Sequence, residues 1–248
     1  MKQFYELRIL SEPPIDIMWH PNSEKVAVIM DPRYDDLMAG VIRNFMRHLN
    51  PYGWNLVIIT HEKHQLEIPG CMVVCISEKR IYYDDAGNPN MTIDSYNGIL
   101  MSREFWEFIP GEHILIFQKD CYMYKMFDES IYLGYAFCGA NCIWLTEDNA
   151  KQGIAINGGC SLRKKSEMLD CIEKISWERI ANIFSPKSRN EDLFFTFACY
   201  LLEKSLPAIE DRCLFAVEHE DTESTCFYHG WNKGYQTEEE ARRLIGSS

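Results

Sequence analysis

The stretch INGGCSLRKK (Ile156–Lys165) joins two adjacent glycines to a cluster of cations. Gly158 and Gly159 allow backbone conformations and close approaches that side chains forbid. The cations that follow, beginning with Arg163, could hold an anionic ligand. Taken alone, the stretch is more typical of a turn that leads into the solvated start of a helix, because Gly-Gly mostly marks turns. The rest of the chain has to decide between these interpretations.

The composition indicates one large domain with its own core. The chain has 248 residues, of which 46% are hydrophobic, and this suits a single domain with at most a small appendage. The formal net charge of −12 disfavours long-range attraction to nucleic acid or to an anionic membrane, since both are polyanions. A small anionic ligand remains compatible with this charge, because a few local cations or a metal ion can hold it.

The ten cysteines are scattered, and no CxxC pair occurs, which argues against a zinc ribbon. Buried free thiols in a reducing compartment are the simpler interpretation. The N-terminal sequence MKQFYELRIL lacks the apolar core of a signal peptide. No apolar run approaches the length of a membrane span. The sequence therefore predicts a soluble, cytoplasmic protein.

The first third of the chain alternates strands and helices. Residues 25–30, 55–60 and 71–76 are short apolar runs, typical of buried strands. Residues 35–50 have apolar residues at helical spacing. This alternation predicts an α/β fold with a mostly parallel central sheet flanked by helices.

Further elements are predicted along the remaining chain. They are a helix over 92–108 with a break near Ser102, a strand over 113–118, helices over 166–175 and 190–204, and a strand over 212–217. No repeat or low-complexity linker interrupts them. We therefore expect one domain over 25–235, an N-terminal strap over 1–24, and a short C-terminal helix and tail over 236–248.

Two acids follow predicted strands. Asp31 comes directly after the first strand, and Asp120 comes just after the strand over 113–118. An aspartate in either place alone is a common turn former. In an open α/β sheet, however, ligands usually bind beyond the carboxyl ends of the strands, so the two acids together favour a site there.

A second group of candidates lies later in the chain. Glu191 and Asp192 open a predicted helix, where acids stabilise the helix dipole or hold a carboxylate rigidly toward a pocket. His229 lies among aromatic residues, where a histidine is more often packed than catalytic. The chain has no GxxxxGK[ST] loop, no GxGxxG after its first strand and no GxSxG. Nucleotide triphosphatases, standard dinucleotide dehydrogenases and hydrolases with a nucleophile elbow are therefore disfavoured.

Taken in order, these segments resemble a known family. The segments are VIMDPR, VIRNFMRHL, IDSYNGILMSREFW, ILIFQKD, CGA, INGGCSLRKKSEML, NEDLFF and YHGW. They resemble a family of uncharacterised domains related to glycosyltransferases, with NGGCSLR followed by EDLFF as the most specific part. The resemblance covers about residues 25–235 and implies the GT-A fold, a nucleotide-binding α/β sheet with an acceptor-binding half.

The resemblance also implies roles for individual residues. It implies nucleotide contacts for Asp31, Pro32 and Arg33. It places an Asn-Gly-Gly loop, formed by Asn157, Gly158 and Gly159, beside the donor sugar and the acceptor pocket, with Arg163 either supporting this loop or meeting phosphate. It gives Asp120 either a divalent cation, Mn²⁺ or Mg²⁺, shared with His229, or the ribose of the nucleotide-sugar, and it implies a catalytic base at Asp192 with Glu191 beside it. One departure concerns the metal. Where an Asp-x-Asp pair is common, Tyr122 occupies the second acidic place.

The implied reaction is transfer of a sugar from a nucleotide-sugar donor, expected to be a UDP-sugar, to an acceptor hydroxyl of a glycan, a protein or a small molecule. Two alternatives stay open. The first is a non-catalytic nucleotide-sugar-binding protein of the same fold, suggested by the missing second aspartate. The second is an α/β methyltransferase or nucleotidyltransferase, against which the absence of a glycine-rich loop after the first strand counts.

Overall fold

The computed structural model describes residues 2–142, 154–186, 188–218, 224–233, 237, 239–240 and 242–243. Most of the predicted C-terminal helix and tail at 236–248 lies outside the described residues. The chain begins with a helix, α1 (Lys2–Leu10), which is followed by irregular structure up to the first strand. Tyr5 and Ile9 of this helix are buried in the core.

The central sheet has six strands in the order β3-β2-β1-β6-β9-β8. Their bounds are β3 (Met72–Cys75), β2 (Asn55–Thr60), β1 (Lys25–Met30), β6 (His113–Phe117), β9 (Ile156–Lys164) and β8 (Phe137–Asn141). The first four strands pair in parallel, whereas β9 runs antiparallel to both β6 and β8. The prediction of a mostly parallel central sheet is therefore confirmed.

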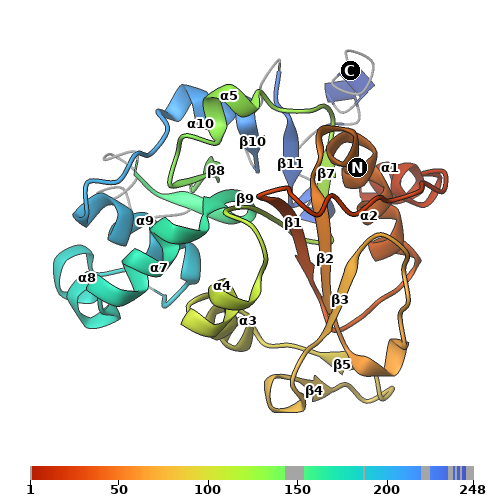
Figure 1. The fold of residues 1–248 in the computed structure, drawn as a ribbon, viewed down its shortest axis with the longest axis horizontal. Coiled ribbons are helices and arrows are strands. Elements are labelled where there is room, and N and C mark those ends of the chain that lie inside the picture. Colours follow the sequence, from red (N-terminus) through yellow and green to blue (C-terminus); the bar gives the residue numbers. More distant parts are fainter. Residues whose placement is uncertain are drawn as a thin grey trace.

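Helices cover both faces of this sheet (Figure 1). In β1, Ala27 and Ile29 face one apolar cluster, while Val28 and Met30 face the other, because successive side chains of a strand point to opposite faces. The first cluster is covered by α1, α2 (Asp36–Leu49), α5 (Glu129–Tyr132) and a small sheet of β10 (Ala216–Val217), β11 (Phe227–His229) and β7 (Cys121–Met123).

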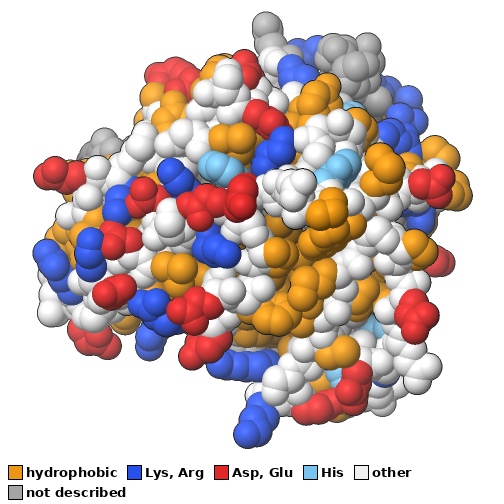
Figure 2. Space-filling model, viewed as in Figure 1, with side chains coloured by type: hydrophobic (Ala, Val, Ile, Leu, Met, Phe, Trp, Pro, Cys, Tyr) orange, Lys and Arg blue, Asp and Glu red, His pale blue; other side chains and the backbone are white. Residues whose placement is uncertain are grey.

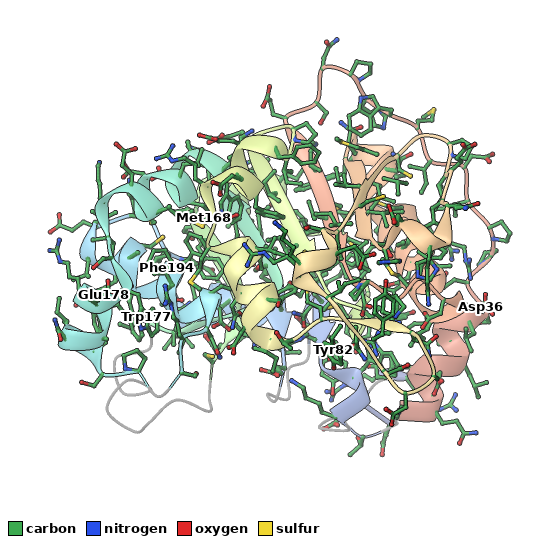
Figure 3. All side chains as sticks on the ribbon, turned by 90° about the horizontal axis from the view of Figure 1, so that it is seen from below. Asp36, Tyr82, Met168, Trp177, Glu178 and Phe194 are labelled. Carbon is green, nitrogen blue, oxygen red and sulfur yellow. The ribbon has the colours of Figure 1, made fainter. Side chains whose placement is uncertain are left out.

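The second cluster is covered by five helices. They are α3 (Ile93–Leu100), α4 (Arg103–Phe108), α7 (Lys165–Lys174), α8 (Trp177–Phe184) and α9 (Glu191–Leu201). Figure 3 shows Met168 of α7 and Phe194 of α9 within this layer, and both side chains belong to the buried cluster. The N-terminus of α9 is thereby brought against the sheet.

The remaining elements are short. They are the hairpin of β4 (Tyr82–Tyr83) and β5 (Pro89–Asn90), helix α10 (Ile209–Phe215), and the 3₁₀ turns η1 (Asn50–Tyr52), η2 (Glu62–His64), η3 (Glu78–Arg80) and η4 (Trp231–Lys233). The break predicted near Ser102 is confirmed, since the Ser102 hydroxyl accepts a hydrogen bond from the Phe105 N–H and caps α4.

The strand predicted over 212–217 is wrong for most of its length. Helix α10 extends to Phe215, and only the next two residues form a strand. Glu210 and Asp211 in the first turn favour the helix through its dipole. The buried Arg212 donates from Nε to the Pro207 carbonyl oxygen and from Nη1 to that of Ala155, so tertiary contacts stabilise the helix end.

On the face seen in Figure 2, acidic and basic side chains are interspersed and do not form one large patch of a single sign. None of the helices in the described part of the chain is both long and apolar enough to cross a membrane. All ten cysteines are free thiols, and seven of them are buried as the sequence predicts, whereas Cys75 is exposed and Cys71 and Cys213 are partly buried.

Candidate active site

A cleft of about 660 Å³ lies beyond the carboxyl ends of β1 and β6. Its walls also include the start of α9, part of β9 and the end of β11. Nine of the residues selected from the sequence line this cleft: Asp31, Pro32, Arg33, Asp120, Asn157, Gly159, Glu191, Asp192 and His229. Gly158 and Arg163 do not line it. The topology thus brings together residues that are far apart in the chain.

The cleft wall that follows β1 contains Asp31, whose carboxylate is paired with Arg33. Arg33 donates from Nε to Asp31 Oδ1 and from Nη2 to Asp31 Oδ2, both at 3.1 Å. The Arg33 backbone N–H also donates to Oδ1 at 2.8 Å. Both carboxylate oxygens are therefore occupied, and Asp31 orients the Arg33 guanidinium at the cleft wall.

The Asn-Gly-Gly segment belongs to the interior strand β9 rather than to a turn or loop, so the expected turn is wrong. A Cβ atom on Gly158 would lie less than 3.0 Å from Glu191 Oε1, and one on Gly159 would lie less than 3.0 Å from the His229 imidazole. Neither glycine has a positive φ. Glycine is therefore required at both positions, because a larger side chain would overlap Glu191 or His229. These neighbours are side chains of the protein itself and not a ligand.

We expect Gly159→Ala to destabilise the fold by about 1–3 kcal/mol, because the new methyl group overlaps the buried imidazole of His229. Urea denaturation measures this change. Gly134→Ala is the matched control, because a Cβ atom there would meet only the Ile131 carbonyl oxygen at 3.6 Å, an ordinary contact. Equal free energies of unfolding for the two variants would contradict this account of the double glycine.

Arg163 belongs to β9, and its fully buried side chain pairs with Glu191. Its Nη2 donates to Glu191 Oε1 at 2.9 Å, and its Nη1 donates to Oε2. The guanidinium carbon lies 4.6 Å from the ring centre of Phe137 and 5.5 Å from that of Phe195. This cation therefore neutralises Glu191 and does not line the cleft, and its Nη2 also donates to the Gly158 carbonyl oxygen of the Asn-Gly-Gly segment at 3.4 Å.

The neighbouring Asp192 has a different environment. Its Oδ1 accepts from the Leu193 N–H at 2.8 Å and its Oδ2 from the Gly158 N–H at 3.3 Å. Within the described residues it forms no ion pair. Burial, followed by the negative charge of Glu191, raises the pKa of Asp192 to about 7. Asp192 is thus a rigidly held carboxylate that titrates near neutral pH at the cleft wall.

His229 faces carboxylates on both edges of its ring. Its Nε2 lies 3.5 Å from Asp120 Oδ1 and 3.1 Å from Gln118 Oε1. Its Nδ1 lies 3.8 Å from Glu218 Oε1. The backbone adds to this arrangement, because the Asp120 carbonyl oxygen accepts hydrogen bonds from the N–H groups of the two residues after His229, at 2.9 and 3.2 Å.

Glu218 connects three parts of the site. This side chain is buried, with 2% exposure. Its Oε2 accepts from Asn157 Nδ2 at 3.0 Å, and its Oε1 accepts from Lys233 Nζ. Together with its position beside His229 Nδ1, these contacts join β9, β11 and η4 around one carboxylate.

The pair of Asp120 and His229 fits a divalent cation. Two adjacent ligands of an octahedral ion, each about 2.1 Å from it, lie about 3 Å apart, close to the observed separation of 3.5 Å. The ligand atoms of Asp120, Cys121 and His229 all lie within 4.8 Å of one another. Tyr122 bears little on this site, since its ring packs against Tyr5 in the core.

Several residues that line the cleft were not selected from the sequence, among them Gln118, Glu218 and Lys233. Gln118 precedes Asp120 by two positions, and Lys233 follows His229 by four, so proximity to selected residues was the available signal. Glu218 lies in a polar run with no local signature.

Many solved structures are similar to this fold, and two of them are glycosyltransferases that match over most of the chain. The apo form of mouse xyloside xylosyltransferase 1 matches with a TM-score of 0.56 and 12% identity, over 86% of this chain and 99% of that chain. Galactosyltransferase LgtC, in complex with donor and acceptor sugar analogues, matches with a TM-score of 0.56 and 10% identity, over 90% of this chain and 95% of that chain. These similarities confirm the GT-A-like α/β fold.

No curated protein matches the chain by sequence. A protein-family profile does match, over residues 85–231. This segment includes Asp120, the β9 glycines, Asp192 and His229, and it covers more than half of the chain. The chain therefore belongs to the family described as "Protein of unknown function (DUF5672)".

Proposed function

We propose that this protein is a glycosyltransferase that moves a sugar from a nucleotide-sugar, a UDP-sugar, to an acceptor hydroxyl. The observation that carries the proposal is one cleft with two distinct carboxylate environments. Asp120 lies beside the imidazole of His229, and Asp192 is buried with a pKa of about 7. The fold shared with two glycosyltransferases supports this interpretation.

The donor half of the cleft combines cations with a place for a metal. Arg33, Lys119 and Lys233 line the cleft, each paired with a carboxylate in this structure, and they are the cations that would contact a diphosphate. Asp120 and His229 would hold Mn²⁺ or Mg²⁺, and such a cation neutralises the departing diphosphate when bound. The Glu218 carboxylate lies 3.8 Å from His229 Nδ1, so its negative charge faces that edge of the ring, while Nε2 faces Asp120.

Asp192 is the proposed catalytic base. Direct displacement with inversion needs an acceptor hydroxyl that loses its proton as it attacks, and a fixed carboxylate can accept that proton. A pKa of about 7 matches this task at neutral pH, because an effective base titrates close to the working pH. Glu191 is less suited to this role, since Arg163 occupies both of its oxygens.

We expect UDP at about 100 times its dissociation constant to stabilise the fold by about 2.7 kcal/mol, and Mn²⁺ to strengthen this effect. For a chain of this size, the corresponding rise in Tm is about 5–10 °C. A thermal-shift measurement with UDP-, GDP- and CMP-sugars, each with and without Mn²⁺, checks the prediction. No shift with any nucleoside diphosphate would count decisively against a nucleotide-sugar site.

Two further measurements distinguish the alternative functions. S-adenosylmethionine in the same panel tests the methyltransferase alternative, and a shift with this compound alone would support it. A turnover assay with the stabilising donor separates an enzyme from a binding protein, because the latter shows the thermal shift without release of nucleotide. Asp120→Asn is the matched variant, and it should lose the additional effect of Mn²⁺ while keeping the effect of UDP alone.

A further inference from the structure

The imidazole nitrogen that faces Asp120 also faces an uncharged oxygen. Gln118 Oε1 lies 3.1 Å from His229 Nε2, closer than Asp120 Oδ1 at 3.5 Å. Gln118 is half-buried, lines the cleft and follows the end of β6 directly. Both oxygens lie at the spacing of about 3 Å that neighbouring ligands of one octahedral cation require.

The Gln118 side chain is held in this orientation from two sides. Its backbone N–H donates to the Gly159 carbonyl oxygen at 3.0 Å, which fixes the residue against β9. On the other side, the Gln118 side chain forms a hydrogen bond with Tyr96. The amide oxygen is the atom that faces His229.

We infer that Gln118 Oε1 is a third protein ligand of the cation held by Asp120 and His229. This set supplies one carboxylate, one amide oxygen and one imidazole, and hence a single formal negative charge. Cations with so few charged protein ligands depend on substrate phosphates to complete their shell. The cation therefore binds together with the nucleoside diphosphate and only weakly before it, a consequence that rests on the proposed function.

A different role for Gln118 makes the opposite prediction. If His229 Nε2–H simply donates to Gln118 Oε1, the nitrogen lone pair needed for a metal is absent, and the contact is a hydrogen bond that closes the site to cations. The metal affinity of variants at position 118 distinguishes the two roles. If Gln118 is a ligand, a negative charge added at this position increases the affinity for the cation. If the site is closed to cations, the added charge leaves the metal affinity unchanged.

Calorimetric titration of the protein with Mn²⁺ alone tests the ligand role. Gln118→Glu keeps the shape of the side chain and adds a negative charge, and it should bind Mn²⁺ at least about tenfold more tightly than the wild-type protein. Gln65→Glu is the control for added charge, because Gln65 is exposed and does not line the cleft. The proposal is overturned if Gln118→Glu binds Mn²⁺ no more tightly than Gln65→Glu.

A second titration, with UDP present, tests the dependence on nucleotide. Wild-type protein should bind Mn²⁺ at least about tenfold more tightly with UDP than without it, and Gln118→Leu should lose most of this affinity while unfolding at a similar temperature. An unchanged affinity in Gln118→Leu would overturn the ligand role. If UDP binds to none of the proteins, the proposed function fails, whereas the titration with Mn²⁺ alone still decides the role of Gln118.

Discussion

Replacing Asp192 with asparagine is expected to lower kcat by about two to four orders of magnitude, the usual contribution of a positioned general base. Asparagine keeps the shape of the side chain and its acceptor oxygen toward the Leu193 N–H, but it cannot accept the proton of the acceptor hydroxyl. The residues proposed to contact the donor, near Asp120, are unchanged in this variant, so donor affinity should change little. Steady-state kinetics with a verified donor and acceptor, together with donor calorimetry, measure both quantities.

The matched control for this substitution is Asp36→Asn. Asp36 also lies in the first turn of a helix, but it does not line the cleft. Its replacement should leave kcat within about a factor of two, the effect of a surface change of at most about 0.5 kcal/mol. Near-normal turnover of Asp192→Asn would remove Asp192 from the role of base and make Glu191 the next residue to test.

The raised pKa of Asp192 also predicts that Asp192→Asn changes how the stability of the fold depends on pH. Because the folded-state pKa of about 7 lies above the ordinary value of 3.8, the folded protein holds a proton that the unfolded chain has released between these pH values. The stability contributed by protonated Asp192 is therefore fully present below about pH 4 and is lost as the pH rises to about 7. Urea denaturation should show this loss in the wild-type protein and a smaller loss in Asp192→Asn.

Arg163→Met is expected to reduce the free energy of unfolding by about 3–5 kcal/mol, the cost of leaving one partner of a buried ion pair without the other. Methionine retains apolar contacts with Phe137 and Phe195, so the loss reports mainly on the uncompensated carboxylate of Glu191. Urea denaturation measures it. Arg103→Met, which breaks exposed pairs with Glu107 and Glu173, should change stability by less than about 1 kcal/mol.

A double substitution tests the reason for that loss. Arg163→Met combined with Glu191→Leu removes both charges, and it should be more stable than Arg163→Met alone, because apolar replacement of a complete buried pair is often neutral. If the double variant is less stable than the single one, the two losses arise from packing, and the ion pair is not the source of the effect.

The sheet could be predicted from the sequence because its strands carry their own signals. The runs over Lys25–Met30 and Asn55–Thr60 are buried on both faces, and such strands read as continuous apolar stretches. Strand β9 carried no such signal. Its glycines are typical of a turn, and the side chains that occupy the space beside them, Glu191 and His229, come from distant parts of the chain.

The same distinction separates the site residues that the sequence identified from those it did not. Asp31 and Asp120 were found because acids beyond strand ends share one edge of a parallel sheet. The role of Arg163 could not be assigned without knowing that β9 is a strand, because the strand directs the Arg163 side chain toward Glu191. Glu218 could not be selected, since a single acid in a polar run acquires meaning only through its distance from His229, and the only signal for Gln118 was its closeness to Asp120 in the sequence.

The hydrogen bonds from Gly230 and Trp231 to the Asp120 carbonyl oxygen also bear on the order in which the protein matures during translation. Sheet strands such as β1 and β2 leave the ribosome early, although a domain generally folds as a unit. Strand β11, with His229, follows only after the whole central sheet has been made. The cleft wall formed by His229 and Lys233 is therefore completed only after all strands of the central sheet have been synthesised.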